Sequence, residues 1–154
     1  GLRERPVGPR AAFAGQLPGF HDYQAIPGRA LAQVEACVRQ LRIDGFKLEQ
    51  IAVLTYGRSG SEILEREMIA GLHTRRFTGR YDSAGNPLWT GGELLVETLY
   101  RFKGQSAPAV ILCEIDFEQL SEVERRKLFV GMTRAQVRLE CVLSERAARG
   151  VLAG

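Results

Sequence analysis

The chain has little of what metal, disulfide and membrane proteins are built from. Its 154 residues include three cysteines, two histidines and one tryptophan. Two histidines and no Cys-X-X-Cys pair offer almost nothing for a zinc or iron–sulfur site, so we expect no metal. Each of the three cysteines lies in a mostly apolar segment: Cys37, Cys113 and Cys141. We therefore expect three reduced core thiols.

Long apolar runs and a strong charge excess are absent as well. No stretch approaches the about 18 apolar residues of a membrane span, and the start has no signal-peptide pattern, which predicts a cytoplasmic protein with no membrane partner. Twenty-one Lys and Arg against 18 Asp and Glu leave a net charge of +3. This charge is too small to indicate nucleic acid by itself.

The chain also lacks the motifs of a self-contained enzyme. GxxxxGK[ST], which cradles phosphates and binds Mg²⁺, occurs nowhere, and GRSGSE at 57–62 does not replace it. Neither His21 nor His73 is expected to belong to a Ser/His/Asp or Cys/His catalytic set. We expect no NTPase cycle and no hydrolysis by this chain alone.

Length and composition indicate one globular domain. Hydrophobic residues make up 45% and charged residues 25% of the chain, and at this size a core is stable without disulfides or metal. Gly1 in place of methionine favours a piece of a longer protein. Residues 1–29 are rich in Gly, Pro and Arg and are expected to form an extended connector, followed by the domain at 30–154.

Apolar patterning predicts alternating helices and strands along the domain. We expect helices at 30–41, at 61–71 with Ser61 as N-cap, and from the Ser121–Glu124 capping box to about 135. Apolar, β-branched runs predict strands at 51–56, 94–100, 109–115 and 137–143, and the SAGN turn predicts a hairpin or loop within 74–90. The predicted fold class is α/β, with helices on both faces of a mostly parallel sheet.

Ligands of such folds bind at loops that follow the strands. Three candidate segments, TYGRSG, YRFKGQ and VGMTRA, each combine glycine with Arg or Lys. Glycine permits close backbone approach and the cations neutralise phosphate oxygens, so these segments predict a phosphate-bearing ligand.

Two longer strings carry a family resemblance. TLYRFKGQSAPAVIL at 98–112 and ERRKLFVGMTRAQVRLECVLSE at 124–145 resemble motifs V and VI of UvrD/Rep-like superfamily I DNA helicases, and IAVLTYGR resembles motif IV. The resemblance implies the C-terminal, second RecA-like (P-loop NTPase-like) motor domain of an ATP-dependent DNA helicase. ATP with Mg²⁺ would be held mainly by an upstream RecA-like domain of the same polypeptide, which would carry the Walker motifs.

Arg134 is the strongest residue assignment that this resemblance implies. In VGMTRA it matches the arginine that reaches the γ-phosphate of a nucleotide held by the facing domain, a catalytic and ATP-binding role. The structural alternative is an arginine at a helix end that pairs with Glu140 or Glu145. Leu128, Phe129, Val130 and Met132 are expected in the core.

Motif IV of the family implies two further nucleotide contacts. Tyr56 would stack on adenine, or else be a core aromatic at the end of a strand. The family places an arginine directly after the aromatic, whereas here Gly57 intervenes before Arg58. Arg58 would therefore either reach the phosphate from a shifted turn, as a second catalytic arginine, or only hold the turn.

Motif V implies contacts to both ligands. Gly104, Gln105 and Ser106 would bind the nucleotide, with Ser106 in place of the usual acidic residue on the ribose. Ser106 would bind more weakly than a carboxylate.

The preceding residues of motif V match single-stranded DNA contacts. These are Thr98, Tyr100, Arg101 and Lys103, where Tyr100 replaces the family's usual histidine. An aromatic among cations suits backbone tracking and base stacking. The alternative for Thr98 and Tyr100 is strand packing.

Only about 40 residues separate motifs IV and V, where large UvrD-type enzymes insert a whole domain. We expect a short insertion at about 74–92 instead, in which Arg75, Arg76 and Arg80 form either a DNA-facing charge or a solvated face. Two function classes remain: a helicase or translocase motor domain, and a non-catalytic nucleic-acid or protein-binding module derived from one.

Overall fold

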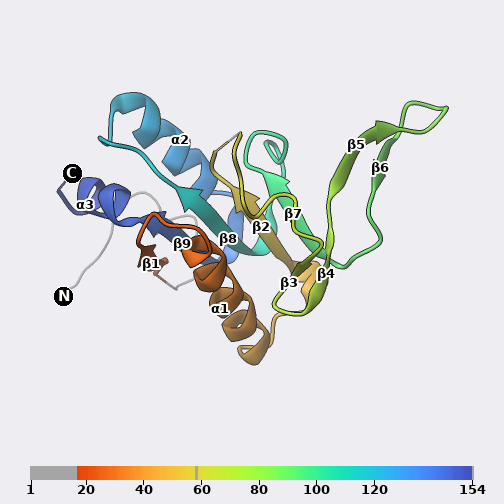
Figure 1. Ribbon diagram of the computed structural model, residues 1–154, viewed down its shortest axis with the longest axis horizontal. Helices are drawn as coiled ribbons and strands as arrows, with labels where there is room; N and C mark the ends of the chain where they lie inside the picture. Colours follow the sequence, from red (N-terminus) through yellow and green to blue (C-terminus); the bar gives the residue numbers. More distant parts are fainter. Residues whose placement is uncertain (1–16, 58, 154) are drawn as a thin grey trace.

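The computed structural model describes residues 17–57 and 59–153, which form a seven-stranded sheet, a separate two-stranded ribbon and helices on both faces of the sheet (Figure 1). In spatial order the sheet strands are β1 (Gly19–Tyr23), β9 (Ala135–Ser144), β8 (Ala107–Ile115), β2 (Ile51–Thr55), β7 (Leu94–Thr98), β4 (Leu72–Arg75) and β3 (Met68–Ile69). Within this seven-stranded sheet, only the β3–β4 pair is antiparallel, and all other neighbouring strands are parallel. The predicted α/β class with a mostly parallel sheet is confirmed.

Two apolar layers hold the helices against the sheet. Helix α1 (Arg29–Ile43) buries Val34, Val38 and Leu41 against one face of β2, β7 and β8. Helix α2 (Glu122–Met132) and helix α3 (Glu145–Ala153) cover the opposite face. A short 3₁₀ turn, η2 (Leu48–Gln50), leads into β2. The result is the expected three layers, with β2, β8 and β9 buried on both sides.

Several predicted elements are confirmed. The first helix, the strands β2, β7, β8 and β9, and the helix after Ser121 lie where the sequence places them, within a few residues. The Ser121 hydroxyl accepts a hydrogen bond from the Glu124 amide at 3.2 Å, which is half of the predicted capping box. Cys37, Cys113 and Cys141 are buried and free, as expected.

The helix predicted at 61–71 does not form. Ser61 Oγ accepts bonds from the amides of Ile63 and Leu64 and donates to the Glu114 carboxylate, which closes a turn instead. Ala70 and Gly71 both have positive φ, 53° and 76°, as a two-residue hairpin turn between β3 and β4 requires. Tertiary contacts thus override a helix-compatible apolar spacing.

The sheet also begins earlier in the chain than expected. Of the predicted connector 1–29, residues 1–16 lie outside the described residues, but Gly19–Tyr23 forms the edge strand β1, parallel to β9. A Cβ at Gly19 would overlap the Glu140 carboxylate, so the glycine lets β1 lie over that side chain. Helix α3 was not predicted.

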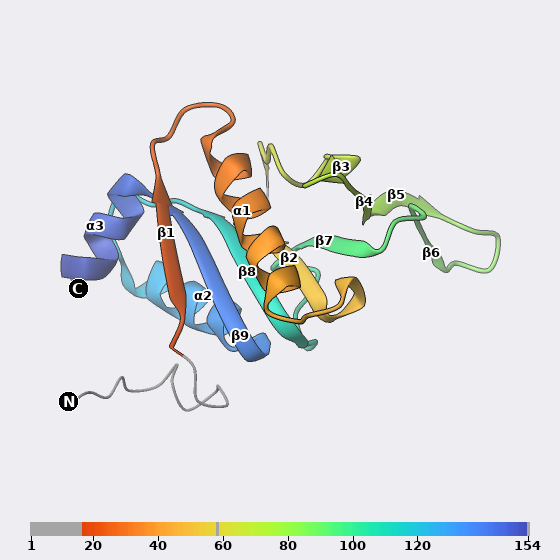
Figure 2. The same cartoon turned by 90° about the horizontal axis from the view of Figure 1, so that it is seen from below.

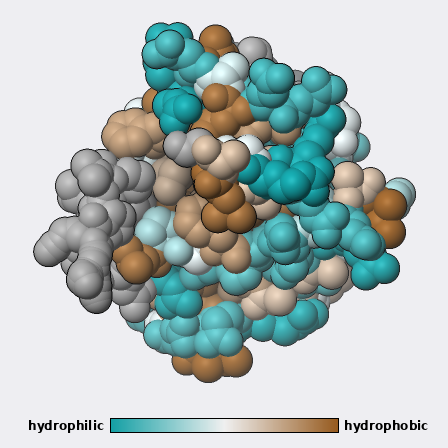
Figure 3. All heavy atoms as spheres, turned by 90° about the vertical axis from the view of Figure 1, so that its left-hand side faces the viewer, coloured by the Kyte–Doolittle hydropathy of each residue, from teal (hydrophilic) through white to brown (hydrophobic). Residues whose placement is uncertain are grey.

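Of the hairpin or loop predicted within 74–90, the structure shows a hairpin. Strands β5 (Phe77–Tyr81) and β6 (Pro87–Trp89) form an antiparallel ribbon that projects from the body of the domain, and Figure 2 shows it reaching away from the main sheet. At the opposite end of the molecule, the face seen in Figure 3 is largely hydrophilic with scattered hydrophobic spots. No helix in the described ranges is both long and apolar enough to cross a membrane.

Candidate functional site

A tight turn connects β7 to β8 and carries most of the motif V residues. The Arg101 amide donates to Thr98 Oγ1 at 3.1 Å, and the Phe102 amide donates to the Thr98 carbonyl at 3.1 Å. Phe102 is buried in the core and anchors the turn, while Gly104 closes it with φ of 80°. Thr98 therefore shapes the turn, and its hydroxyl is already engaged within the chain.

The DNA candidates on this turn point to two different places. Tyr100 is exposed, and Lys103 Nζ lies 5.0 Å from the centre of its ring. The Arg101 guanidinium lies 3.9 Å from the ring centre of Phe77 in the ribbon, and its Nε is 3.4 Å from Glu97 Oε2. Tyr100 and Lys103 thus belong to one surface, whereas Arg101 links the turn to the ribbon.

Arg134 lies just beyond the carboxyl end of α2. Its Nε donates to the Val130 carbonyl and its Nη1 to the Gln105 carbonyl, both at 3.2 Å. Its side chain makes no ion pair within the described part of the chain. Glu140, one partner of the structural alternative, instead contacts Arg138 and His21. Arg134 is thus held by neutral carbonyls with its charge uncompensated by any described residue.

The segment 104–106 lies beside Arg134, as the predicted nucleotide site requires. Gln105 supplies the carbonyl bound by Arg134, and the Ala107 amide donates to the Arg134 carbonyl at 3.0 Å. The Ser106 hydroxyl accepts a bond from Gln136 Nε2 at 2.9 Å. A ribose hydroxyl would share or replace this contact.

Tyr56 is placed differently. Its side chain is 3% exposed. Its hydroxyl donates to Glu124 Oε1 at 2.5 Å. The Glu124 carboxylate therefore binds Tyr56 and not the backbone amide of Ser121, as the full capping box would require. Burial, followed by this bond, raises the pKa of the phenol well above its usual range. Lys127 Nζ lies 4.3 Å from the ring centre, and a stacking base would have to displace it.

The Tyr56 and Arg134 side chains bond to carbonyls near opposite ends of α2, those of Glu124 and Val130. The Tyr56 amide bonds to the Cys113 carbonyl near the end of β8, whereas Arg134 is bonded to Ala107 at its start. These two backbone points are six strand residues, or about 20 Å, apart, whereas the two carbonyls on α2 are six helical residues, or about 9 Å, apart. Arg58 lies outside the described residues.

The surroundings of Tyr56 are also acidic. A hollow of about 390 Å³ opens beside Tyr56 at the carboxyl ends of β1, β2 and β8, and its lining includes Glu62, Glu114, Asp116 and Glu124. Carboxylates repel phosphate, so this edge is unfavourable for the triphosphate. The roles of Tyr56 and Arg58 stay predictions.

A second, largely apolar groove of about 430 Å³ runs between the turn and α2. It is lined by Tyr56, Leu99, Tyr100, Lys103, Arg126, Lys127 and Val130. Sequence reasoning missed this groove, because it placed Phe129 and Val130 in the core, where the structure leaves them 48% and 41% exposed. Helical spacing was the signal, since positions 126, 127 and 130 share one face of α2. The groove joins cations and an exposed aromatic, as nucleic-acid surfaces do.

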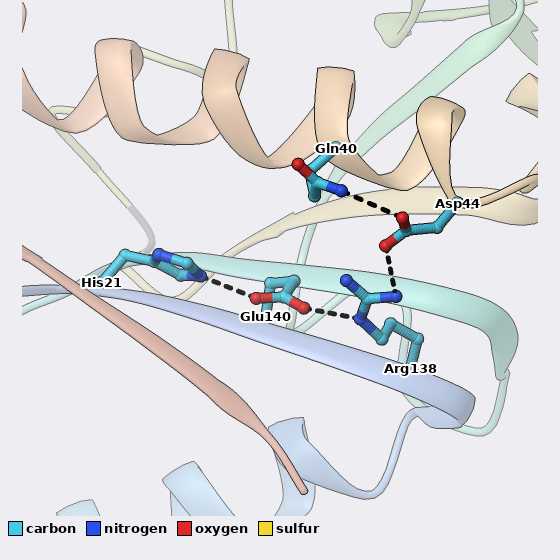
Figure 4. A network of polar contacts seen from close by, with 5 residues as sticks. All are labelled: His21, Gln40, Asp44, Arg138 and Glu140. Carbon is cyan, nitrogen blue, oxygen red and sulfur yellow. Dashed lines mark hydrogen bonds and ion pairs between the residues drawn. The ribbon is translucent and has the colours of Figure 1, made fainter. Parts of the chain in front are cut away.

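One cluster has residue types suited to metal ligation. The ligand atoms of His21, Cys37 and Glu140 lie within 4.8 Å of one another. However, the Glu140 carboxylate already bonds His21 and Arg138, and Arg138 continues to Asp44 (Figure 4). Burial and the neighbouring Glu140 raise the pKa of the Cys37 thiol to about 12, so it keeps its proton. We assign the cluster to a polar network that ties β1 and β9 to α1.

Comparisons with known proteins agree with this picture. Residues 93–140, which span the turn, α2 and Arg134, match the model of the UvrD-like helicase C-terminal domain. No curated protein sequence matches the chain. The C-terminal domain of a possible DNA helicase from Lactobacillus plantarum WCFS1 has a similar fold, with a TM-score of 0.60 and 22% identity over 92% of this chain and 87% of that one.

The motif IV segment lies outside the matched residues, so its resemblance stays a prediction. Motifs V and VI lie within the match, apart from a few residues at the end of motif VI. Over residues 93–140 the sequence is thus similar to the UvrD-like helicase C-terminal domain, and the fold is similar to that of the C-terminal domain of a possible DNA helicase.

Proposed function

We propose that the chain is the C-terminal motor domain of an ATP-dependent DNA helicase or translocase. It would complete an ATP site whose P-loop belongs to an upstream RecA-like domain of the same polypeptide, and it would contact single-stranded DNA. The observation that carries this proposal is Arg134, a part-exposed guanidinium that faces no described carboxylate.

The residues around Arg134 fit one part of a nucleotide, its terminal phosphate. Phosphoryl transfer spreads negative charge over the γ-phosphate oxygens, and an arginine supplied by a second domain stabilises that charge. Two carbonyls orient the Arg134 side chain and leave it part of its hydrogen-bonding capacity. In this proposal Mg²⁺ and the remaining phosphates are held by the upstream domain.

The groove between the turn and α2 supports the DNA contact. Tyr100 is exposed at its edge, and Lys103, Arg126 and Lys127 line it. Aromatic faces stack on bases, while cations follow the phosphates. This groove would hold the strand on the same domain that carries Arg134.

The alternative is a non-catalytic binding module derived from such a motor. The acidic hollow beside Tyr56 favours it. An upstream P-loop sequence in the same gene would exclude this alternative.

The first test concerns completeness. The purified 154-residue chain should show no DNA-stimulated ATP hydrolysis, because it contains no P-loop. A coupled phosphate-release assay measures this, with the Arg134→Ala chain as control. Turnover that Arg134→Ala abolishes would contradict the split site, whereas turnover equal in both chains indicates a contaminant.

The second test concerns the DNA contact. Replacing Arg101 and Lys103 together by Ala should weaken binding of a labelled oligothymidylate and reduce the slope of log affinity against log salt by about 1.4, since each lost phosphate contact on a single strand removes about 0.7. Fluorescence anisotropy at several salt concentrations measures both. An unchanged slope would assign these side chains to structure.

A further inference from the structure

The β5–β6 ribbon is held together in an unusual way for an exposed element. It pairs with no strand of the main sheet, and most of its residues are exposed. Two strands alone are marginally stable in water, so side-chain contacts within the ribbon and with its neighbours must supply the difference. Those contacts are a column of aromatic rings and arginines.

Three aromatic rings form the centre of this column. The ring of Phe77 lies 5.9 Å from that of Trp89 and meets that of Tyr81 edge-on at 5.5 Å. Gly79, with φ of 85°, lies between Phe77 and Tyr81 at an irregularity in the strand pairing and leaves that space without a side chain. The Tyr81 side chain remains 57% exposed.

Arginines cover the other ring faces. The Arg75 guanidinium carbon lies 4.7 Å from the Trp89 ring centre, and that of Arg101 lies 3.9 Å from the Phe77 ring centre. A guanidinium stacked on a ring keeps its N–H groups at the edge, where they can bind phosphate oxygens. Because Arg101 comes from the β7–β8 turn, the column is continuous with the turn that carries Tyr100.

The segment 74–92, which includes the end of β4 and the ribbon, carries a net positive charge. Residues 74–92 contain three arginines and one acidic residue, Asp82. The carboxylate of Asp82 accepts bonds from the amides of Ala84 and Asn86 at 2.9 Å each and shapes the tip. Arg80 is exposed, and its guanidinium forms no hydrogen bond, ion pair or ring contact with another described residue. The unpaired charge that the ribbon presents is therefore cationic.

We propose that the β5–β6 ribbon is a second contact for single-stranded DNA, in which Tyr81 stacks on a base and Arg75 and Arg80 bind the flanking phosphates. This inference rests on the proposed function, which supplies the strand. A single strand is the ligand because a base within a duplex is already stacked on both faces, whereas an unpaired base offers a face to a phenol ring.

Trp89 makes the proposal testable at its own site, because it is the only tryptophan in the sequence and lies in the column. Oligothymidylate added to the 154-residue chain should change Trp89 fluorescence with the same midpoint as anisotropy of the labelled oligonucleotide. Tyr81→Ala should weaken binding by about fivefold to tenfold, and Tyr81→Phe should retain it, since stacking needs the ring and not the hydroxyl.

Arg80→Ala keeps the test independent of the aromatic column. It should weaken binding by about threefold and reduce the salt slope by about 0.7. Arg149→Ala on α3, at the far end of the molecule, is the matched control and should change neither quantity. The Trp89 emission maximum of each free variant reports whether the ribbon is still folded.

The outcomes separate this proposal from the proposed function. Binding seen by anisotropy, with silent Trp89 and unaffected Tyr81→Ala and Arg80→Ala variants, overturns the ribbon contact and leaves the groove as the DNA site. No binding by anisotropy overturns both. Tighter binding of blunt duplex than of single strand, or a Trp89 response to polyglutamate instead of DNA, also overturns the proposal.

Discussion

Arg134→Ala should lower the ATPase rate of the protein that joins this chain to the proposed upstream P-loop domain by at least about 10²-fold, mostly in kcat. The reason is that an arginine on the γ-phosphate gains contact strength as charge develops in the transition state. Removing two hydrogen bonds to carbonyls at a part-exposed site should cost the fold about 1 kcal/mol or less. Steady-state kinetics with saturating DNA, together with thermal unfolding, measures both effects.

Arg134→Lys refines this expectation. Lysine keeps the charge but lacks the planar fork that binds two phosphate oxygens, so it should restore little of the rate. DNA affinity should stay near that of the unmodified protein in both variants. A melting temperature lowered by many degrees with kcat unchanged would make Arg134 a structural residue and refute the assignment.

Gly92→Ala should destabilise the domain by about 3 kcal/mol and lower Tm by roughly 10 °C. Gly92 lies where the chain returns from the ribbon and crosses the backbone of β4. A Cβ at this position would overlap the carbonyl oxygens of His73 and Thr74. Backbone atoms cannot swing aside as side chains do, so the crossing itself would have to open.

The neighbouring glycine provides a matched control for this prediction. A Cβ at Gly91 would meet nothing within 4 Å. Gly91→Ala should therefore change the free energy of unfolding by about 0.5 kcal/mol or less. Urea titration followed by circular dichroism compares the two variants, and equal stability would show that the crossing relaxes without cost.

The sequence predicts the centre of this fold well because the central strands are buried on both faces. Runs such as 51–56 and 109–115 are apolar apart from Thr55 and Glu114, and their β-branched residues favour strands. The start of α2 could also be predicted, because the Ser121 hydroxyl caps the helix through a local hydrogen bond from the Glu124 amide.

The wrong predictions concern segments whose structure depends on contacts with residues far away in the sequence. Ser61 is bound to Glu114, 53 residues away, and nothing local distinguishes this contact from a helix cap. Strand β1 forms through its pairing with β9, which is more than 100 residues later in the chain. Val130 is exposed because the β7–β8 turn does not cover it. The grouping of Tyr56 with Arg134 in one nucleotide site stays a prediction, because motif order contains no information about distance.

Helix α2 is fastened at both ends. Near its start Tyr56 holds Glu124, and beyond its end Arg134 holds the carbonyl of Gln105, while Gly131 lets the helix lie so close to the sheet that a Cβ would be 2.8 Å from Leu112 Cδ2. A helix held to the sheet at both ends cannot rotate independently of the sheet. In the proposed motor, a movement that brings Arg134 toward a facing domain would therefore carry the sheet and the groove with it.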